Sequence, residues 1–598
     1  RRTGRTTIAR SVDAEDDRLR SWVLGLPADR LLLVAAMLPF VVSAMALVVG
    51  VGASYVPVSD HALSEMLVRD VGRHPVLSGL YSRENWSHPG PILYYILAPF
   101  YWVTGGSSIG LSLGALAING GSVVGMGLIA RRRAGTAAMA ATFLGTALLM
   151  RTLGAEFFGD FWNCFITVMP FGLLIFLAWS MLDGDRWALP VGVFVATFLA
   201  QTHVGFVILA LPLLALGAGG LVLSTRRNDA PDRWRSLVRP GVVSAALGSV
   251  LWLPPLVDIA NGPPGNLSNA IKYFRTTDEA PRSVSEGLRV MSGQFGIRPE
   301  WATKVEPYSF LGESRYIYSP VVPWLLVLVA ASAAFVCRRK GTGRSLVLMA
   351  AASFGVGVLA VARTVGLAFQ YRLLWTYIPA VVGFLIVALA AWELISSRGG
   401  PNVRRGAVAV ASTALLVLTG VNVVTAATAG VPNPDETAAM SSLSSQVLEF
   451  VDDSDGPVLV VDPFSGAAWY ARGIVLQLDR NGIDAVVLPE NSWEVSEHRV
   501  QRKGPVAVEL VVVSDEAVTT MLNAPGHTLI AEWSVVSEER IDAYEKGRAG
   551  RRAEVEAGRM SEFAAVMVDR EQSKRIVTPG GAIAYRVAVF EKTASADK

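Results

Sequence analysis

The chain has 598 residues, of which 52% are hydrophobic and only 17% are charged, and it contains two cysteines. A chain this apolar is not water-soluble throughout, and a chain this long exceeds one compact domain. The cysteine count excludes a disulfide scaffold, and the hydrophobicity excludes intrinsic disorder. The 53 basic and 50 acidic residues leave a net charge of +3, so composition gives no support to nucleic-acid binding.

Apolar runs of about 20 residues, the length that crosses a bilayer as a helix, recur after an arginine-rich segment at residues 1–30. The predicted spans are residues 31–52, 109–130, 135–150, 161–182, 187–203, 204–223, 240–260, 317–336, 345–362, 371–395 and 406–428. The sequence therefore predicts a polytopic α-helical membrane protein with about 11 transmembrane helices within residues 31–428.

The basic residues predict the orientation of these spans. Alternation of eleven spans places every arginine cluster between them on one side, for example residues 131–133 and 404–405. Because positive loops face the cytoplasm, residues 1–30 are expected to be a cytoplasmic tail in a multi-pass plasma-membrane protein. Loops 53–108 and 261–316, and everything after residue 428, then face outward.

Residues 91–103 are apolar and rich in aromatics but short for a span. We expect a re-entrant or interfacial helix there, and a short tilted span is the alternative.

Residues 429–598 differ in composition from the rest and form a predicted extracytoplasmic α/β domain. Strands are expected at 457–461, 484–488, 507–514, 528–533, 563–568 and 583–590, and helices at 466–480, 515–522 and 538–560. A sheet covered by helices is the expected result.

Ionisable groups at the membrane surface are the candidate functional residues, because burying them is costly without a purpose. Asp60 and His61 follow the first span closely. Apolar surroundings can make such a carboxylate a usable general base. The alternative for Asp60 is a solvated loop acid or a helix N-cap.

A second group gathers an acid, a base, an imidazole and an indole in one short stretch, at Arg83, Glu84, Trp86 and His88. Its density is typical of a site for substrate. An interfacial aromatic anchor with loop polar groups is the alternative.

Two further groups are predicted at the same outer face. One group contains Asp160 and Asn163, and the other contains Gln201 and His203. Each could instead hydrogen-bond a neighbouring helix.

Three cations on the outer side are candidate phosphate ligands: Lys272, Arg275 and Arg372. A guanidinium suits phosphate through bidentate hydrogen bonding. For Arg372, snorkelling to the interface is the alternative.

These residues carry a resemblance to the GT-C superfamily of membrane glycosyltransferases, over roughly residues 31–395. Locally the chain resembles a bacterial, actinobacterial branch related to the protein mannosyltransferases and arabinosyltransferases. The matching motifs are residues 81–83, 86, 88–91 and 94–95, then 161–163, 201–205 and 252–255.

The resemblance implies transfer of a sugar, with inversion, from a polyprenyl-phosphate donor to a cell-envelope glycan, lipid or protein. Asp60 matches the family's catalytic acid in the first outer loop. Family members often pair that acid directly with another, whereas here His61 follows it, which leaves Glu84 or Asp160 as the second carboxylate. The expected cofactor is none, although Asp60, His61 and Glu65 could together ligate a divalent metal ion.

The sequence leaves two other functional classes open. A transporter or flippase of lipid-linked sugars predicts internal repeats, and none is evident. A non-catalytic envelope assembly protein predicts that Asp60 and Glu84 are replaceable. In all three classes membrane lipids surround the chain.

Overall fold

The structure is a computed structural model. It describes residues 27–50, 55–83, 86–227, 233–261, 265–303, 312–338, 342–452, 454–463, 466–502, 504–535, 537–562, 564–565, 568–569 and 584–592.

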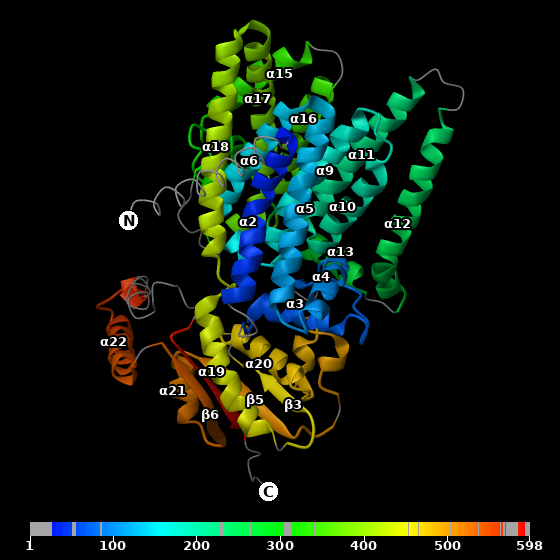
Figure 1. Ribbon diagram of the computed structural model, residues 1–598. Coiled ribbons are helices and arrows are strands. Elements are labelled where there is room, and N and C mark those ends of the chain that lie inside the picture. Colours follow the sequence, from blue (N-terminus) through cyan, green and yellow to red (C-terminus); the bar gives the residue numbers. More distant parts are fainter. Residues whose placement is uncertain are drawn as a thin grey trace, which may run out of the picture.

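A bundle of long apolar helices makes up most of these residues (Figure 1). Its helices are α2 (Ala28–Gly50), α5 (Ile109–Ala134), α6 (Thr136–Leu153), α9 (Val168–Leu182), α10 (Ala188–Thr202), α11 (Gly205–Arg226), α12 (Arg235–Ala260), α15 (Trp324–Cys337), α16 (Thr342–Ala362), α17 (Tyr377–Arg398) and α18 (Pro401–Ala427). Nine helical segments in the described part of the chain are long and apolar enough to cross a membrane, and α10 and α15 are shorter apolar helices. Each of the eleven predicted spans therefore coincides with a helix.

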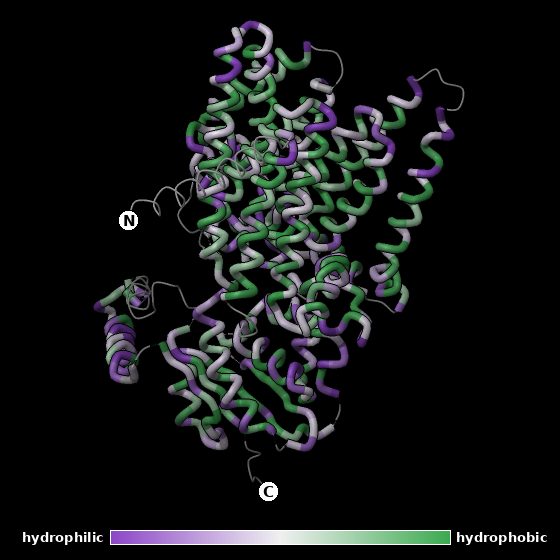
Figure 2. The backbone as a smooth tube through the Cα atoms, viewed as in Figure 1, coloured by the Kyte–Doolittle hydropathy of each residue, from purple (hydrophilic) through white to green (hydrophobic). Residues whose placement is uncertain are grey.

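The bundle has a protein-facing centre and a lipid-facing exterior. The segment Asn163–Leu182, which contains α9, is 89% buried, whereas the apolar window of α12 is 11% buried. Hydrophobic residues predominate along the length of the bundle (Figure 2). Helices satisfy their own backbone hydrogen bonds, so apolar side chains can face lipid at no polar cost.

Short elements cover the end of the bundle that faces the sheet. They are α3 (Ser59–Asp70), β1 (Tyr81–Arg83), β2 (Trp86–Ser87), α4 (Ile92–Val103), α7 (Glu156–Gly159), α8 (Asn163–Ile166), α13 (Asn266–Thr276), α14 (Val284–Gly293), η2 (Glu300–Ala302), η3 (Arg315–Ile317) and η4 (Gln370–Thr376). Helix α4 coincides with the expected interfacial helix at residues 91–103, and α3 and α4 lie side by side between bundle and sheet (Figure 1).

The remaining elements surround a five-stranded sheet of order β4-β3-β5-β7-β6. They are α19 (Pro434–Val451), β3 (Val458–Val461), α20 (Ala468–Arg480), β4 (Ala485–Val487), η5 (Pro489–Asn491), η6 (Glu497–Arg499), β5 (Val508–Ser514), α21 (Glu516–Leu522), β6 (His527–Ser534), α22 (Glu538–Glu556) and β7 (Arg586–Lys592). Strands β4, β3 and β5 run parallel, while β7 is antiparallel to β5 and β6.

The expected strand at residues 563–568 is wrong. Of that range, Ala564, Ala565 and Val568 are helical, and residues 563, 566 and 567 lie outside the described residues. The apolar run there is too short to distinguish a strand from a buried helical turn by periodicity. Strands coincide with the other five predictions, and helices α20, α21 and α22 with the three predicted helices.

Candidate active site at the N-terminal end of α3

A cavity of about 110 Å³ lies at the end of the bundle where α3, the α10–α11 corner, α13 and η4 meet. Among the residues that line it are these predicted site residues: Asp60, Trp86, His88, Asn163, His203 and Arg372. They come from five separate parts of the sequence. The fold thus brings together the groups that the sequence placed on one surface.

Asp60 lies in the first turn of α3, and its carboxylate is held by two neighbours. The indole Nε1 of Trp162 donates to Oδ2 at 3.1 Å. The Nη1 atom of Arg472 lies 3.6 Å from Oδ1. The side chain keeps 27% of its surface exposed, so the carboxylate is oriented by its partners and still accessible.

Arg472 belongs to α20 and reaches Asp60 from the sheet region. It donates to both Glu494 oxygens, from Nε at 2.8 Å and from Nη2 at 2.9 Å. Its guanidinium also lies over the ring of Tyr81, 4.6 Å from the centroid. These contacts fix its position, so the sheet region contributes a cation beside the candidate base.

His61 and Asp160 form a buried ion pair next to Asp60. The Nε2 atom of His61 lies 2.7 Å from Oδ1 of Asp160, which also accepts from the backbone N–H of Trp162 at 2.7 Å. Burial alone would lower the pKa of His61, but the charge and hydrogen bond of Asp160 raise it above its usual value. Neither residue lines the cavity, and the pair anchors the segment that carries Trp162.

His88 and His203 contribute neutral imidazoles to the cavity wall, with ring centroids 4.6 Å apart. Burial, and to a smaller extent the positive charge of Arg372, lowers the pKa of His203 to about 3. Burial, His203 and Arg372 lower the pKa of His88 well below its usual value. Both rings are therefore uncharged at neutral pH.

Backbone hydrogen bonds select the tautomer of both rings. The N–H of Val204 donates to Nδ1 of His88 at 3.3 Å, and that of Gly205 donates to Nδ1 of His203 at 3.1 Å. An Nδ1 atom that accepts a hydrogen bond carries no proton, so each neutral ring has its N–H at Nε2. The pair can therefore donate hydrogen bonds to hydroxyl or phosphate oxygens without adding charge.

Arg372 lies in η4 on the same wall. Its Nη1 donates to the carbonyl of Leu367 at 3.1 Å, and the neighbouring Tyr371 packs on Trp162 with centroids 4.8 Å apart. The guanidinium and the Asp60 carboxylate thus border one cavity, linked through the aromatic pair.

Trp86 is buried against α13, whose aromatic residues share the cavity. Its ring centroid lies 5.7 Å from that of Tyr273 and 5.5 Å from that of Phe274. On the same helix, Lys272 and Arg275 are exposed and are not among the lining residues.

The other predicted site residues have packing contacts or fall outside the described side chains. Gln201 is fully buried and donates from Nε2 to the carbonyl of Leu251 at 2.7 Å. Asn163 donates to the carbonyl of Thr202 at 3.4 Å. Arg83 is the last residue of β1, and its side chain lies outside the described part of the structure. Glu84 lies outside the described residues altogether.

The residues considered for a metal ion have separate partners. Nε2 of His61 contacts Asp160, while the Glu65 carboxylate accepts from Arg480, Ser108 and Tyr101. The carboxylate of Glu65 is therefore committed to a different set of contacts from that of Asp60.

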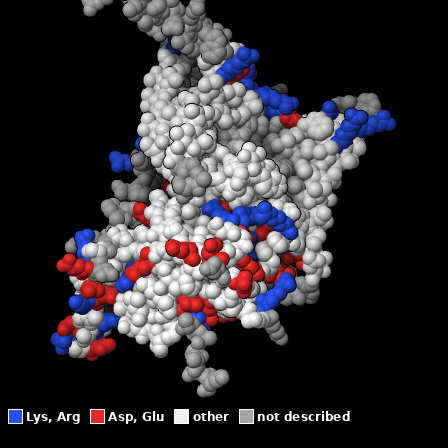
Figure 3. Space-filling view, turned by 60° about the horizontal axis from the view of Figure 1, so that its bottom comes forward, with Lys and Arg blue, Asp and Glu red and all other residues white. Residues whose placement is uncertain are grey.

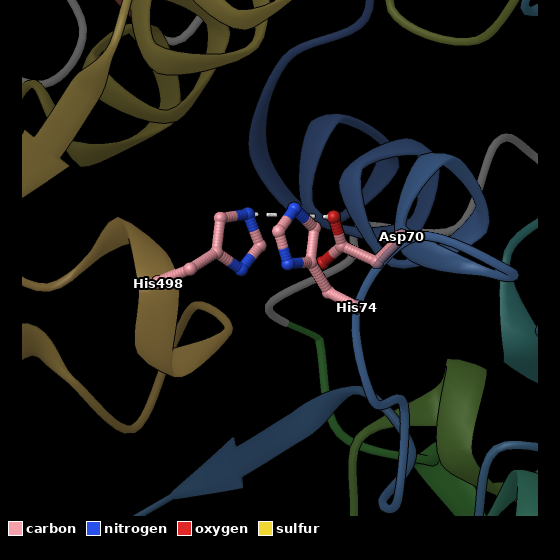
Figure 4. A group of neighbouring side chains, drawn as sticks. All are labelled: Asp70, His74 and His498. Carbon is pink, nitrogen blue, oxygen red and sulfur yellow. Dashed lines mark ion pairs between the residues drawn. The ribbon is translucent and has the colours of Figure 1, made fainter.

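Among the described residues, Asp70, His74 and His498 form a group whose possible ligand atoms lie within 4.8 Å of one another (Figure 4). The two imidazoles stack at 3.6 Å with an interplanar angle of 12°, so their in-plane lone pairs run side by side and do not converge. Arg499 donates to both Asp70 oxygens, at 2.7 and 2.8 Å. The geometry is that of an ion-paired contact between α3 and η6, and it does not preform an ion site.

No protein-family model matches the chain, and no curated protein matches it in sequence. Solved structures do match. ArnT from Cupriavidus metallidurans bound to undecaprenyl phosphate aligns with a TM-score of 0.51 and 14% identity, covering 94% of this chain and 98% of ArnT. ArnT in the apo state aligns with a TM-score of 0.50 and 13% identity, covering 86% and 96%. The chain therefore has the same overall fold as ArnT.

The archaeal oligosaccharyltransferase AglB from Archaeoglobus fulgidus also aligns, with a TM-score of 0.46 and 10% identity over 94% of this chain and 88% of AglB.

Proposed function

We propose that this protein is a glycosyltransferase that moves a sugar from a polyprenyl-phosphate carrier to a hydroxyl of a cell-envelope glycan, lipid or protein. The observation that carries the proposal is the cavity in which the Asp60 carboxylate, two neutral imidazoles and the Arg372 guanidinium meet. A carbohydrate reaction of this kind needs a proton acceptor, donors for hydroxyls and a cation for phosphate. The undecaprenyl phosphate bound to ArnT supports the choice of carrier.

In the proposed reaction, the acceptor oxygen attacks the anomeric carbon while Asp60 takes its proton. The bond between that carbon and the phosphate oxygen breaks, and the lipid phosphate leaves with the bonding electrons. Attack from the face opposite the phosphate inverts the configuration. Arg372 stabilises the charge that develops on the leaving phosphate.

The other residues bind and position. His88 and His203 donate to sugar hydroxyls or to phosphate through Nε2, and Trp86 and Asn163 border the sugar. Lys272 and Arg275, exposed on α13, meet the carrier phosphate as it approaches.

Asp160 acts through His61 and Trp162, and Arg472 through its contact with Asp60, so these are positioning residues. Gln201 holds the α10 end in place through its bond to Leu251. The roles of Arg83 and Glu84 stay predictions from sequence, and so does the choice between Glu84 and Asp160 as the second carboxylate.

We further propose that residues 31–428 form the membrane domain and residues 429–598 an extracytoplasmic domain, with residues 1–30 in the cytoplasm. Helices α3 and α13, which contribute residues to the cavity lining, lie at the end of the bundle next to the sheet (Figure 1), which supports one common outer side. The actinobacterial branch, with arabinose or mannose as the sugar, rests on the sequence motifs and stays a prediction.

The experiment is a transfer assay with the purified full chain and a panel of polyprenyl-phosphate sugars, beginning with arabinose and mannose donors. Transfer to a cell-envelope glycan acceptor with inverted anomeric configuration is the expected result. Retained configuration would contradict the mechanism. Movement of labelled lipid across a proteoliposome membrane without transfer would instead establish a transporter.

A further inference from the structure

A second and larger pocket lies at the opposite end of α3 from Asp60. Its volume is about 550 Å³, and its lining includes Arg69, Arg73, Tyr101, Ser107, Ser108 and Arg480. These residues come from the C-terminal end of α3, the turn between α4 and α5, and the end of α20. No lining residue is shared with the Asp60 cavity.

Two of its guanidiniums are fixed by ion pairs. Arg69 donates from Nε to Asp479 at 2.6 Å and from Nη1 to Tyr101 at 3.2 Å. Arg480 donates from Nε and Nη2 to the two oxygens of Glu65, at 2.8 and 2.7 Å. An arginine has five N–H donors in a rigid fork, so each guanidinium is held in place with further donors to offer.

The balance of charge in and around the pocket is positive. Arg73 is exposed, and no ion pair to it is found in the described part of the chain. The three guanidiniums therefore outnumber the two nearby carboxylates, which are those of Glu65 and Asp479. No carboxylate is among the residues lining the pocket in the described ranges, so an incoming anion meets donors and no like charge.

The N-terminus of a helix adds to this preference. Helix α5 begins at Ile109, directly after the pocket residues Ser107 and Ser108, and the positive end of a helix dipole favours an anion. The hydroxyl of Ser108 is buried and bound to Glu65 and Arg480, so it helps to fix the Arg480 guanidinium.

Exposed apolar side chains lie at the edge of the pocket. Its lining residue Trp102 is 56% exposed, and the adjacent Val103 is 89% exposed. Tryptophan is enriched at the headgroup level of membranes. Figure 3 shows basic side chains gathered at the junction between the uncharged bundle and the part of mixed charge below it.

We propose that this pocket binds the phosphate of an anionic phospholipid headgroup from the surrounding leaflet, with Trp102 against the lipid glycerol and upper chains. The site is separate from that of the carrier lipid and does not depend on the proposed transfer reaction. Because Arg69 and Arg480 each join the α3–α4 layer to α20, the bound lipid stabilises the contact between membrane and sheet regions.

The test uses the full chain in uncharged detergent and measures binding and melting temperature. The probes are dioctanoyl phosphatidylglycerol, dioctanoyl phosphatidylcholine and inorganic phosphate. We expect phosphatidylglycerol to bind most tightly and to raise the melting temperature. Arg73→Ala should weaken that binding about tenfold, the worth of one charge-assisted contact. The control Arg298→Ala removes another exposed arginine and should leave it unchanged.

Each remaining outcome is decisive. Equal binding of the two lipids, or equal loss in the Arg73 and Arg298 variants, would overturn the proposal. Binding of inorganic phosphate as tight as that of phosphatidylglycerol would show a site for free anions and overturn the lipid assignment. Trp102→Ala should weaken lipid binding and leave phosphate binding unchanged, and loss of neither would contradict the role of Trp102.

Discussion

The two ends of α3 face two different environments. At the N-terminal end, the carboxylate of Asp60 is partly exposed beside a cavity with neutral imidazoles. Toward the C-terminal end, Glu65 is fully buried and bound to Arg480, and guanidiniums line the pocket. A carboxylate thus serves a site at one end of the helix, and another carboxylate holds two regions together toward the other end. Accessibility and partner number separate the two roles.

The largest effect on stability is expected at Glu65. Glu65→Ala leaves Arg480 without its buried partner, and breaking a buried pair in this way costs about 3–5 kcal/mol in the free energy of unfolding. Denaturation of the full chain in detergent measures it. The control Glu554→Gln removes an exposed pair with Arg559 and should leave stability unchanged. Equal effects would show that the α3–α20 contact is not a source of stability.

A smaller effect, on turnover, is expected at Arg472. Arg472→Gln frees one side of Asp60, so kcat should fall roughly ten- to a hundredfold because orientation is lost. KM for the donor should stay nearly constant, and Arg472→Lys should restore part of kcat. A change in KM alone would place Arg472 in substrate binding.

Arg372→Ala should lower kcat/KM for the donor through both kcat and KM, because Arg372 binds the phosphate and stabilises the charge that develops on it. Loss of a charge-assisted contact to phosphate lowers kcat/KM about tenfold. Arg363→Ala, an exposed arginine outside the cavity lining, is the matched control. An unchanged kcat/KM in Arg372→Ala would remove this residue from the phosphate site.

The smallest expected effect depends on pH and involves His61. Its pKa is raised by Asp160, so the charged pair contributes stability that is fully present below the ordinary histidine pKa. That stability is lost as pH rises through the raised pKa. The difference in melting temperature between wild type and His61→Asn should therefore shrink at alkaline pH, by on the order of 2 °C. A difference that grows with pH would contradict a protonated His61.

Sequence predicted most of the fold because apolar length is a strong signal. Even α10 and α15, which are short for a span, were predicted from their apolar runs. Asp60, His88 and His203 were found as polar groups near the membrane surface. The strand prediction at residues 563–568 was wrong because a short apolar run has no clear periodicity.

The contribution of α20 to the candidate site could not be predicted from the sequence. Arg472 lies more than 400 positions from Asp60, and nothing local links the two. One signal was present: Arg472, Asp479 and Arg480 recur at helical spacing in a segment predicted as a helix. Such a charged face indicates a partner surface, but only the fold shows that the partner is α3.

The most direct test of the account is the rate of sugar transfer in a single turnover by Asp60→Asn. Asp278→Asn, an exposed aspartate outside the cavity lining, is the control. We expect a loss of about 10²- to 10⁴-fold for Asp60→Asn, with donor binding retained and the control unaffected. Transfer by Asp60→Asn at the wild-type rate would contradict it.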